Sequence, residues 1–329
     1  MPTPPGPVSW VAAFANELGV QTLDTTLLSS SAKVLDTRAR IGYPFSQLLE
    51  FSFCTSGGPS AQALRYVIDV TSLGDDDARA IAGTGIGLLE DSMDPVQHSS
   101  SLRRLDTLFD GDTNGALFAV GAEHVADGSL CTLKTYWRLA SPVDELGSLL
   151  PKAEERRLSE LIVRVQSFWP RWERARLIGI DDAASGDNAL KVYLPQKDLV
   201  EPLSLVTLCT FLLSLGWQVD VEAFPKLSYF ILGRRVEVEP TAYSLGLAMA
   251  ARPSVKLEIA AQAYFSDSQE TLQSACCLAE SLGLDSSFPR AGVEALEQFA
   301  PLSRPPVTEV ICLAFYPDGN KRITLYCRP

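Results

Sequence analysis

The chain has 329 residues, of which 46% are hydrophobic and 21% charged, and its formal net charge is −12 at pH 7. Proteins that bind nucleic acids need a local excess of lysine and arginine, so this acidic balance argues against a nucleic-acid partner. A closed barrel with a helical coat reaches this length as one unit, and we expect a single domain over residues 1–329.

Cysteine and histidine usage excludes several site types. The seven cysteines are odd in number and lack CxxC spacing, which indicates buried thiols in a reducing compartment. His98 and His124 lie far from any cysteine pair, which argues against a zinc site or a Ser-His-Asp triad. Met1–Pro7 lacks the order of a signal peptide, and Leu203–Val219 falls short of a membrane span. These features predict a cytoplasmic protein without a membrane partner, and a buried helix within Leu203–Val219.

Segments with strand character recur as five pairs, at intervals of roughly sixty to seventy residues. Each pair is joined by a turn-rich link, such as Asp127-Gly128 or Pro317-Asp318-Gly319-Asn320, which is typical of a hairpin. In chain order the predicted pairs are Leu48–Cys54 with Ala63–Val70, Ala116–Ala122 with Leu130–Leu139, Arg176–Asp181 with Ala189–Leu194, Tyr243–Ala250 with Val255–Ala260, and Glu309–Phe315 with Arg322–Cys327.

Amphipathic segments with a 3.6-residue period lie between the pairs. They predict outer helices at Ser148–Phe168, Leu203–Leu215, Ser268–Leu282 and Ala291–Phe299. Five helix-plus-hairpin units can close into a barrel, which removes exposed sheet edges. The predicted fold is of the α+β class: a ten-stranded antiparallel β-barrel of five ααββ-type repeats, with helices outside and a lumen that admits a ligand.

The second strand of every pair carries a cation, often followed two residues later by a tyrosine on the same face. A solvated strand face can show this pattern without any function. Here, however, the outer helices would cover the apolar set, such as Leu133 and Trp137, so the polar set is predicted to face the lumen. The cations are Arg65, Lys134, Lys191, Lys256 and Arg322, and the tyrosines are Tyr136, Tyr193 and Tyr326.

Five cations inside one lumen need an anion, because a buried charge is costly unless it is compensated. A diphosphate is a polyanion of suitable size, and the tyrosine faces beside it can shield an allylic carbocation. Glu50, on the first strand, shares a face with Ser52 and points into the same lumen. As a carboxylate among cations, Glu50 is either a salt-bridge partner or a functional acceptor.

Three segments, in their order and spacing, resemble the soluble aromatic prenyltransferases with the αββα barrel, including the dimethylallyltryptophan synthase family. They are Leu49-Glu50-Phe51-Ser52 followed by Arg65, Lys134-Thr135-Tyr136, and Lys191-Val192-Tyr193. As a repeat pattern, the resemblance covers nearly the whole chain. It implies that the five cations bind diphosphate, that the three tyrosines screen the allyl cation, and that Glu50 accepts a hydrogen bond from an indole N–H. The phenol-modifying members have a magnesium-holding aspartate instead, so a glutamate favours an indole acceptor.

Two positions depart from the indole-modifying members. Ala189 stands where those enzymes have an arginine, and Glu258 stands where they have a tyrosine. The resemblance implies that no cofactor is required, but one fewer cation leaves room for Mg²⁺ to assist; no metal ligands are identified in the sequence. The DDxxD motif of terpene cyclases is absent, and Asp75-Asp76-Asp77 and Asp181-Asp182 are interpreted as solvated turns.

The implied reaction moves a dimethylallyl or geranyl group from its diphosphate to an indole or tryptophan derivative. The allylic diphosphate ionises, the aromatic ring attacks the cation, and the ring loses a proton. The compact length is similar to that of bacterial relatives in secondary metabolism that prenylate indole alkaloids or peptide side chains. The alternatives are prenylation of a phenol or a peptide, a non-catalytic relative that binds isoprenyl diphosphate, and a terpene cyclase.

Overall fold

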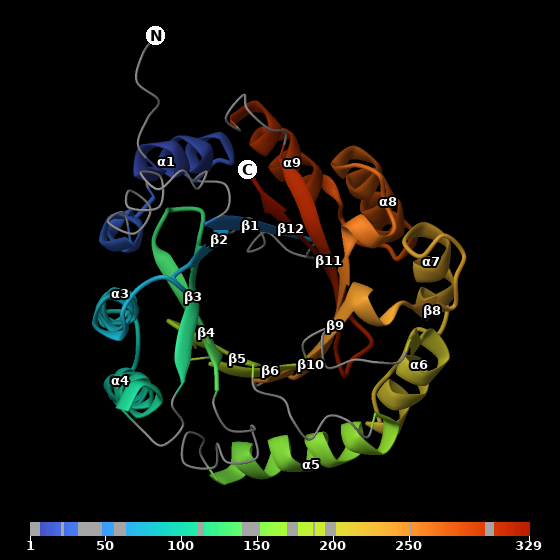
Figure 1. Cartoon of the computed structure of the whole chain (residues 1–329), viewed down its shortest axis with the longest axis horizontal. Helices are drawn as coiled ribbons and strands as arrows, with labels where there is room; N and C mark the ends of the chain where they lie inside the picture. Colours follow the sequence, from blue (N-terminus) through green and yellow to red (C-terminus); the bar gives the residue numbers. More distant parts are fainter. Residues whose placement is uncertain are drawn as a thin grey trace.

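A ten-stranded closed barrel forms the centre of the protein. The computed structural model describes residues 7–20, 23–31, 48–55, 64–110, 115–139, 152–169, 177–186, 188–194, 202–250, 252–299 and 306–329. The barrel strands follow one another in the order β1-β12-β11-β10-β9-β6-β5-β4-β3-β2, and every neighbouring pair is antiparallel. Figure 1 looks down this ring, with the helices arranged around its outside. The predicted barrel and its helical coat are therefore confirmed.

The strands are short, and most are joined in hairpins along the chain. The barrel consists of β1 (Leu49–Cys54), β2 (Leu64–Asp69), β3 (Ala116–His124), β4 (Leu130–Arg138), β5 (Leu177–Ala183), β6 (Ala189–Leu194), β9 (Tyr243–Met249), β10 (Ser254–Ala260), β11 (Val307–Phe315) and β12 (Lys321–Arg328). A separate two-stranded ribbon pairs β7 (Leu203–Ser204) with β8 (Glu237–Val238). Each of the five predicted strand pairs forms an antiparallel pair of the barrel.

The helices form the outer layer. They are α1 (Pro7–Glu17), α3 (Asp75–Gly87), α4 (Pro95–Asp110), α5 (Lys152–Phe168), α6 (Leu205–Ser214), α7 (Ala223–Phe230), α8 (Ser268–Ser281) and α9 (Ser287–Phe299). Within the described ranges, no helix combines the length and the apolar character needed to cross a membrane.

The hydrophobic core lies between the barrel wall and the helices. On β1, the outward rings of Phe51 and Phe53 meet Phe14 of α1 and Phe288 of α9, at ring-centroid distances of 4.7 Å and 6.1 Å respectively. Trp137 of β4 is fully buried in the same layer. Because strand residues alternate between faces, an apolar outer face leaves the intervening positions to line the lumen. The lumen is therefore available for polar side chains.

Two expectations about local structure were wrong. Asp181 and Asp182 lie inside β5 and not in a solvated turn, and both side chains are held by cations: Asp181 by Lys191 and Asp182 by Arg104. Asp75-Asp76-Asp77 is solvated, but it forms the first turn of α3, where acidic side chains suit the helix dipole.

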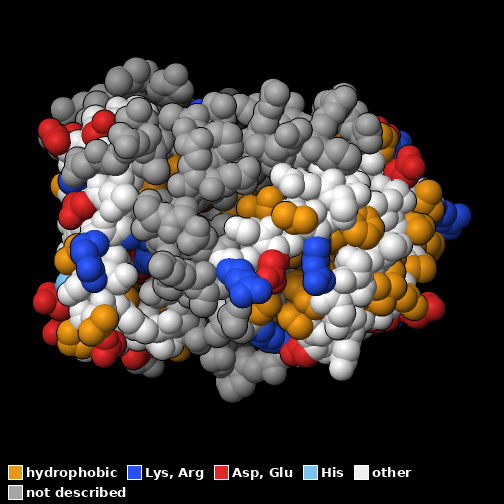
Figure 2. Space-filling model, turned by 90° about the horizontal axis from the view of Figure 1, so that it is seen from below, with side chains coloured by type: hydrophobic (Ala, Val, Ile, Leu, Met, Phe, Trp, Pro, Cys, Tyr) orange, Lys and Arg blue, Asp and Glu red, His pale blue; other side chains and the backbone are white. Residues whose placement is uncertain are grey.

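The apolar stretch Leu203–Val219 was expected to be a buried helix. It begins instead with the ribbon strand β7, and α6 covers the barrel with one side only. Val206 and Leu213 on the other side are 69% and 50% exposed. Figure 2 views the molecule from the side that carries α5 and shows hydrophobic side chains on its surface. The apolar composition of this stretch predicted full burial and was wrong, whereas its 3.6-residue period predicted an amphipathic outer helix, which is confirmed.

Candidate active site

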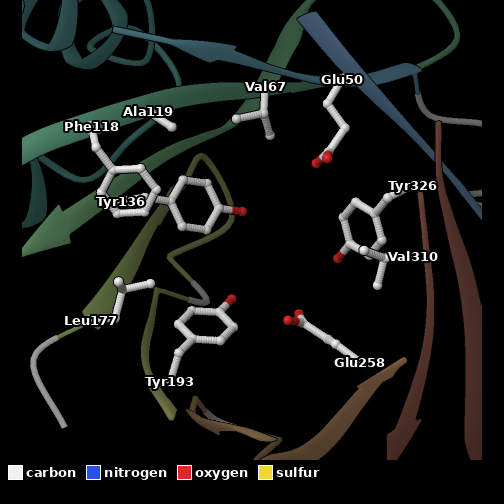
Figure 3. A pocket seen from close by; sticks show the side chains of 10 residues that line it. All are labelled: Glu50, Val67, Phe118, Ala119, Tyr136, Leu177, Tyr193, Glu258, Val310 and Tyr326. Carbon is white, nitrogen blue, oxygen red and sulfur yellow. The ribbon is translucent and has the colours of Figure 1, made fainter. Parts of the chain in front are cut away.

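The lumen holds two adjoining pockets, each of about 220 Å³, which share Val67, Tyr136 and Tyr326 in their walls. We call the first the cation pocket, because all five predicted diphosphate-binding residues line it: Arg65, Lys134, Lys191, Lys256 and Arg322. We call the second the carboxylate pocket; Figure 3 shows its lining residues Glu50, Val67, Phe118, Ala119, Tyr136, Leu177, Tyr193, Glu258, Val310 and Tyr326.

The barrel register explains how cations from five separate strands meet. Each cation stands on the second strand of its hairpin, on β2, β4, β6, β10 or β12. Antiparallel pairing places Lys134 opposite Asp181 and Arg65 opposite Glu123, while Lys256 and Arg322 flank the same residue of β11, Ala314. Directly opposed strand residues point to the same face, so the five side chains converge.

Two half-buried carboxylates hold three of the cations in place. Glu123 accepts hydrogen bonds from Arg65 Nη2 at 2.6 Å and pairs with Lys134 Nζ at 3.1 Å. Burial opposes the charge of Glu123, but Lys134 and Arg65 outweigh it and hold the pKa of this carboxyl well below its usual range. Lys191 Nζ donates to Asp181 Oδ1 at 2.5 Å, which orients the amine in the pocket.

The cation pocket has more positive than negative charge. Among the described residues, Lys256 and Arg322 have no carboxylate within 4.0 Å, and the buried Nε atoms of Arg65 and Arg322 have no hydrogen-bond partner. A sixth basic residue of the lining, Arg252, is exposed and already paired with Asp318. The other five cations exceed Glu123 and Asp181 by three positive charges when all of these groups are ionised. Burial lowers the pKa of Lys191 to about 7, although Asp181 opposes this shift. A ligand with three negative charges would therefore compensate the positive charge of the cation pocket.

Cys54 is a buried neighbour of the cation pocket that the sequence pattern did not reveal. Arg65 Nη1 donates a hydrogen bond to its Sγ. Burial raises the pKa of a thiol, but Arg65 and Arg322 outweigh burial and lower the pKa of Cys54. The sulfur thus lies where the positive charges of two guanidinium groups act together.

Three tyrosines line the carboxylate pocket, and two of them, Tyr136 and Tyr326, also border the cation pocket. The Tyr136 and Tyr193 ring centroids lie 6.4 Å apart, and Tyr326 stands across from them on β12 (Figure 3). Glycines make room for these rings: a Cβ atom on Gly179 would lie 3.2 Å from both Tyr136 and Tyr193, and one on Gly246 would lie 3.1 Å from Tyr193. The ring faces are therefore close to the barrel wall and open toward the lumen.

The two carboxylates of the second pocket have a different environment from Glu123 and Asp181. No described lysine, arginine or histidine nitrogen lies within 4.0 Å of Glu50 or Glu258. Burial raises the pKa of Glu50 to about 7; Arg328 opposes this shift, while Glu309 and Glu258 add to it. The sequence left two roles open for Glu50, a salt-bridge partner or a functional acceptor. Among the described residues, Glu50 forms no salt bridge.

Comparisons with known proteins give a match at the level of structure only. No family model and no curated protein matches the sequence. The solved ternary complex of the prenyltransferase PriB with L-tryptophan and dimethylallyl thiolodiphosphate has a TM-score of 0.62 and 16% identity, and the alignment covers 98% of this chain and 95% of that one.

The 5-dimethylallyltryptophan synthase from Streptomyces coelicolor gives a TM-score of 0.55 and 16% identity, over 97% and 96% of the two chains. The 6-dimethylallyltryptophan synthase from Micromonospora olivasterospora gives 0.58 and 14%, over 85% and 81%. The protein has the fold of the aromatic prenyltransferases.

Within this prenyltransferase fold, all nine predicted site residues line the lumen. The five cations lie in the first pocket, Glu50 and Tyr193 in the second, and Tyr136 and Tyr326 in the wall of both. The roles of Glu123, Asp181 and Cys54 were not predicted from the sequence. A usable signal existed for the first, because Arg65 and Glu123 fall directly opposite each other once their strands are aligned. No group of three or more histidine, cysteine, aspartate or glutamate side chains in the described part of the chain could hold a metal ion.

Proposed function

We propose that the protein transfers an isoprenyl group, dimethylallyl or geranyl, from its diphosphate to an electron-rich aromatic acceptor, an indole or tryptophan derivative. The observation that carries the proposal is the division of the lumen: five cations line one pocket, and three tyrosines and two carboxylates line the adjoining one. The prenyltransferase fold supports it, and one solved neighbour is a complex with L-tryptophan and dimethylallyl thiolodiphosphate.

The cations drive the first step. The allylic C–O bond breaks, its electron pair leaves with the diphosphate, and the cation pocket stabilises the charge that develops on the departing oxygens. Lys256 and Arg322 are free to bind those oxygens, because no described carboxylate neutralises them. Arg65, Lys134 and Lys191 are pre-oriented by Glu123 and Asp181 and need little rearrangement.

The tyrosines and Glu50 serve the second step. The faces of Tyr136, Tyr193 and Tyr326 stabilise the allyl cation and keep water away from it. Ionised Glu50 accepts a hydrogen bond from the indole N–H, which raises the electron density of the ring as the ring attacks the cation. The attacked ring carbon then loses its proton to a base, and aromaticity is restored.

We further propose that the reaction needs no metal. Once diphosphate binding has protonated Lys191, the five cations exceed Glu123 and Asp181 by three charges, which matches a diphosphate trianion. Residues 1–329 would act as one domain, since β1 and β12 pair across the whole chain. The acidic net charge and the free thiols are consistent with a cytoplasmic protein that has no nucleic-acid or membrane partner.

The test is turnover of dimethylallyl and geranyl diphosphate against a panel of indoles, phenols and peptides, with Mg²⁺ and with EDTA. We expect an indole to gain the mass of one prenyl unit, with full activity in EDTA. Lys134→Ala should lose diphosphate affinity, whereas Arg156→Ala, at an 83% exposed site on α5, should not. Diphosphate binding without any product would favour the non-catalytic alternative, and a hydrocarbon formed without an acceptor would favour a terpene cyclase.

A further inference from the structure

The only charged residues in the described lining of the carboxylate pocket are acidic. Its ten lining residues include Glu50 and Glu258 but no lysine, arginine or histidine. The two glutamates come from strands three positions apart around the barrel, β1 and β10. Figure 3 shows both carboxylates pointing into the space that the three tyrosine rings enclose. A ligand in this space meets negative charge from two directions.

Glu258 is fixed in place without being neutralised. Ser244, directly opposite on β9, donates its hydroxyl hydrogen to Glu258 Oε2 at 2.7 Å. This hydrogen bond leaves the second carboxylate oxygen available to a ligand. The charge of Glu258 is felt across the pocket, because it contributes to the raised pKa of both Glu50 and Tyr193, behind burial as the main cause.

The basic residue that acts on Glu50, Arg328, is already engaged with another carboxylate. Arg328 is the one basic residue that lowers the pKa of Glu50, but its Nε lies 2.8 Å from Glu309 Oε2. Among the described residues, the charges of the lumen are thus separated, with an excess of cations at one end and of carboxylates at the other. Two ligands that fill the lumen together should have the opposite polarity: an anionic donor and a cationic acceptor.

We propose that the acceptor is an indole with a basic side-chain nitrogen, whose ammonium group binds Glu258 while Glu50 takes the ring N–H. This inference rests on the proposed function and narrows its acceptor class. An ammonium group compensates a carboxylate that is shielded from water, and tyrosine faces add cation–π attraction. An acceptor with a free carboxylate would instead add a third negative charge, for which the described lining offers no cation.

Three ligands with the same ring and the same two-carbon chain isolate the charge: tryptamine (cationic), tryptophol (neutral) and indole-3-propionate (anionic). Their dissociation constants are measured by calorimetry at pH 7.5 with the protein saturated with dimethylallyl thiolodiphosphate. We expect tryptamine to bind about thirtyfold more tightly than tryptophol, the lower end for a charge pair removed from water. Indole-3-propionate should bind the most weakly.

A variant then assigns the preference to one residue. Glu258→Gln keeps the size of the side chain and an oxygen that can accept from Ser244, but removes the charge. The tryptophol-to-tryptamine ratio of dissociation constants should fall to about one in this variant, since only the charge pair distinguishes the two ligands. Glu237→Gln, at an exposed position of β8, removes one negative charge outside the barrel and should preserve the wild-type ratio.

The outcomes separate this inference from the proposed function. Equal binding of tryptamine and tryptophol by the wild-type protein, or tightest binding of indole-3-propionate, would overturn the inference, while prenylation of any of the three would keep the proposed function. If Glu258→Gln slows turnover of every acceptor but leaves the binding ratio intact, Glu258 acts on the allyl cation and the inference is wrong. If no indole binds or gains a prenyl group, the proposed function fails and the inference falls with it.

Discussion

Lys191 offers the most direct measurement of diphosphate binding, because its amine should gain a proton when the ligand arrives. Burial lowers its pKa to about 7 in the free protein, against the opposing charge of Asp181. At pH 8 about nine in ten of these amines are therefore neutral. An opposite charge within about 4–6 Å raises an amine pKa by about 1–3 units, which restores the ammonium form in the complex. Diphosphate binding should therefore make Lys191 take up about 0.8 proton at pH 8.

Calorimetry in buffers of different ionisation enthalpy measures this uptake. The ligand is the sulfur-linked analogue of dimethylallyl diphosphate, which is already ionised at pH 8 and contributes few protons itself. The slope of observed enthalpy against buffer ionisation enthalpy equals the number of protons exchanged. Burial also lowers the pKa of Lys256, so the total uptake includes a second amine. The contribution of Lys191 is therefore read from the difference between the wild-type protein and Lys191→Met.

Lys191→Met should lower the proton uptake by about 0.8 and weaken diphosphate binding, since a charge-assisted contact to the ligand is lost. Lys321→Met makes the same chemical change at a lysine that pairs with Asp220 on the outside of the barrel. This control should bind the diphosphate with wild-type affinity and proton uptake. If the two variants take up the same number of protons, or if the wild-type protein releases protons at pH 8, the account of Lys191 as a buried, ligand-protonated amine is refuted.

Three further predictions concern the other groups of the lumen. Acceptor binding should weaken as the pH falls through about 7, because the Glu50 carboxylate, whose pKa is raised, takes up a proton there. Glu50→Gln should weaken acceptor binding about tenfold and remove this pH dependence. A pH profile that is unchanged in the variant would assign the titration to another group. Gly246→Ala should lower kcat about tenfold by displacing the Tyr193 ring while diphosphate affinity is kept, whereas loss of both would indicate a collapsed barrel. Alkylation of Cys54 by iodoacetamide, followed by peptide mass mapping, should be at least about tenfold slower with diphosphate bound, and equal rates would place the diphosphate away from Arg65 and Cys54.

The barrel could be predicted because the sequence pattern of each strand is local. In β4, Leu133 and Trp137 alternate with Lys134 and Tyr136, and this two-residue period assigns each side chain to a face before any contact is known. The second strand of each hairpin shows the same alternation. The convergence of the five cations on the lumen could therefore also be predicted. Helix burial was less predictable: the composition of α6 indicated a buried helix, but Val206 and Leu213 face outward.

The carboxylates of the cation pocket could not be predicted from local pattern. Asp181 is followed by Asp182 and then by the turn residues Ser185 and Gly186, a run whose propensities favour a turn. Asp181 nevertheless lies in β5, opposite Lys134 of β4 and Ala189 of β6, and its side chain forms an ion pair with Lys191, although aspartate has a low strand propensity. Which strands become neighbours also determines the partners of Glu123, since it binds one cation from β2 and another from β4. Such pairs follow from the topology of the closed barrel.

The pairing of β1 with β12 also determines when the protein can fold. Thr55 and Ile323, 268 residues apart, exchange hydrogen bonds beside this pair of strands. During synthesis, therefore, the growing sheet keeps two open edges, one of them β1, until β12 has been made and can pair with β1. Contacts between such distant segments are formed slowly, and the unpaired edges can associate with other chains in the meantime. Removing β12 would leave β1 and β11 as permanent edges, so aggregation during production would be the first sign of damage to this end of the chain.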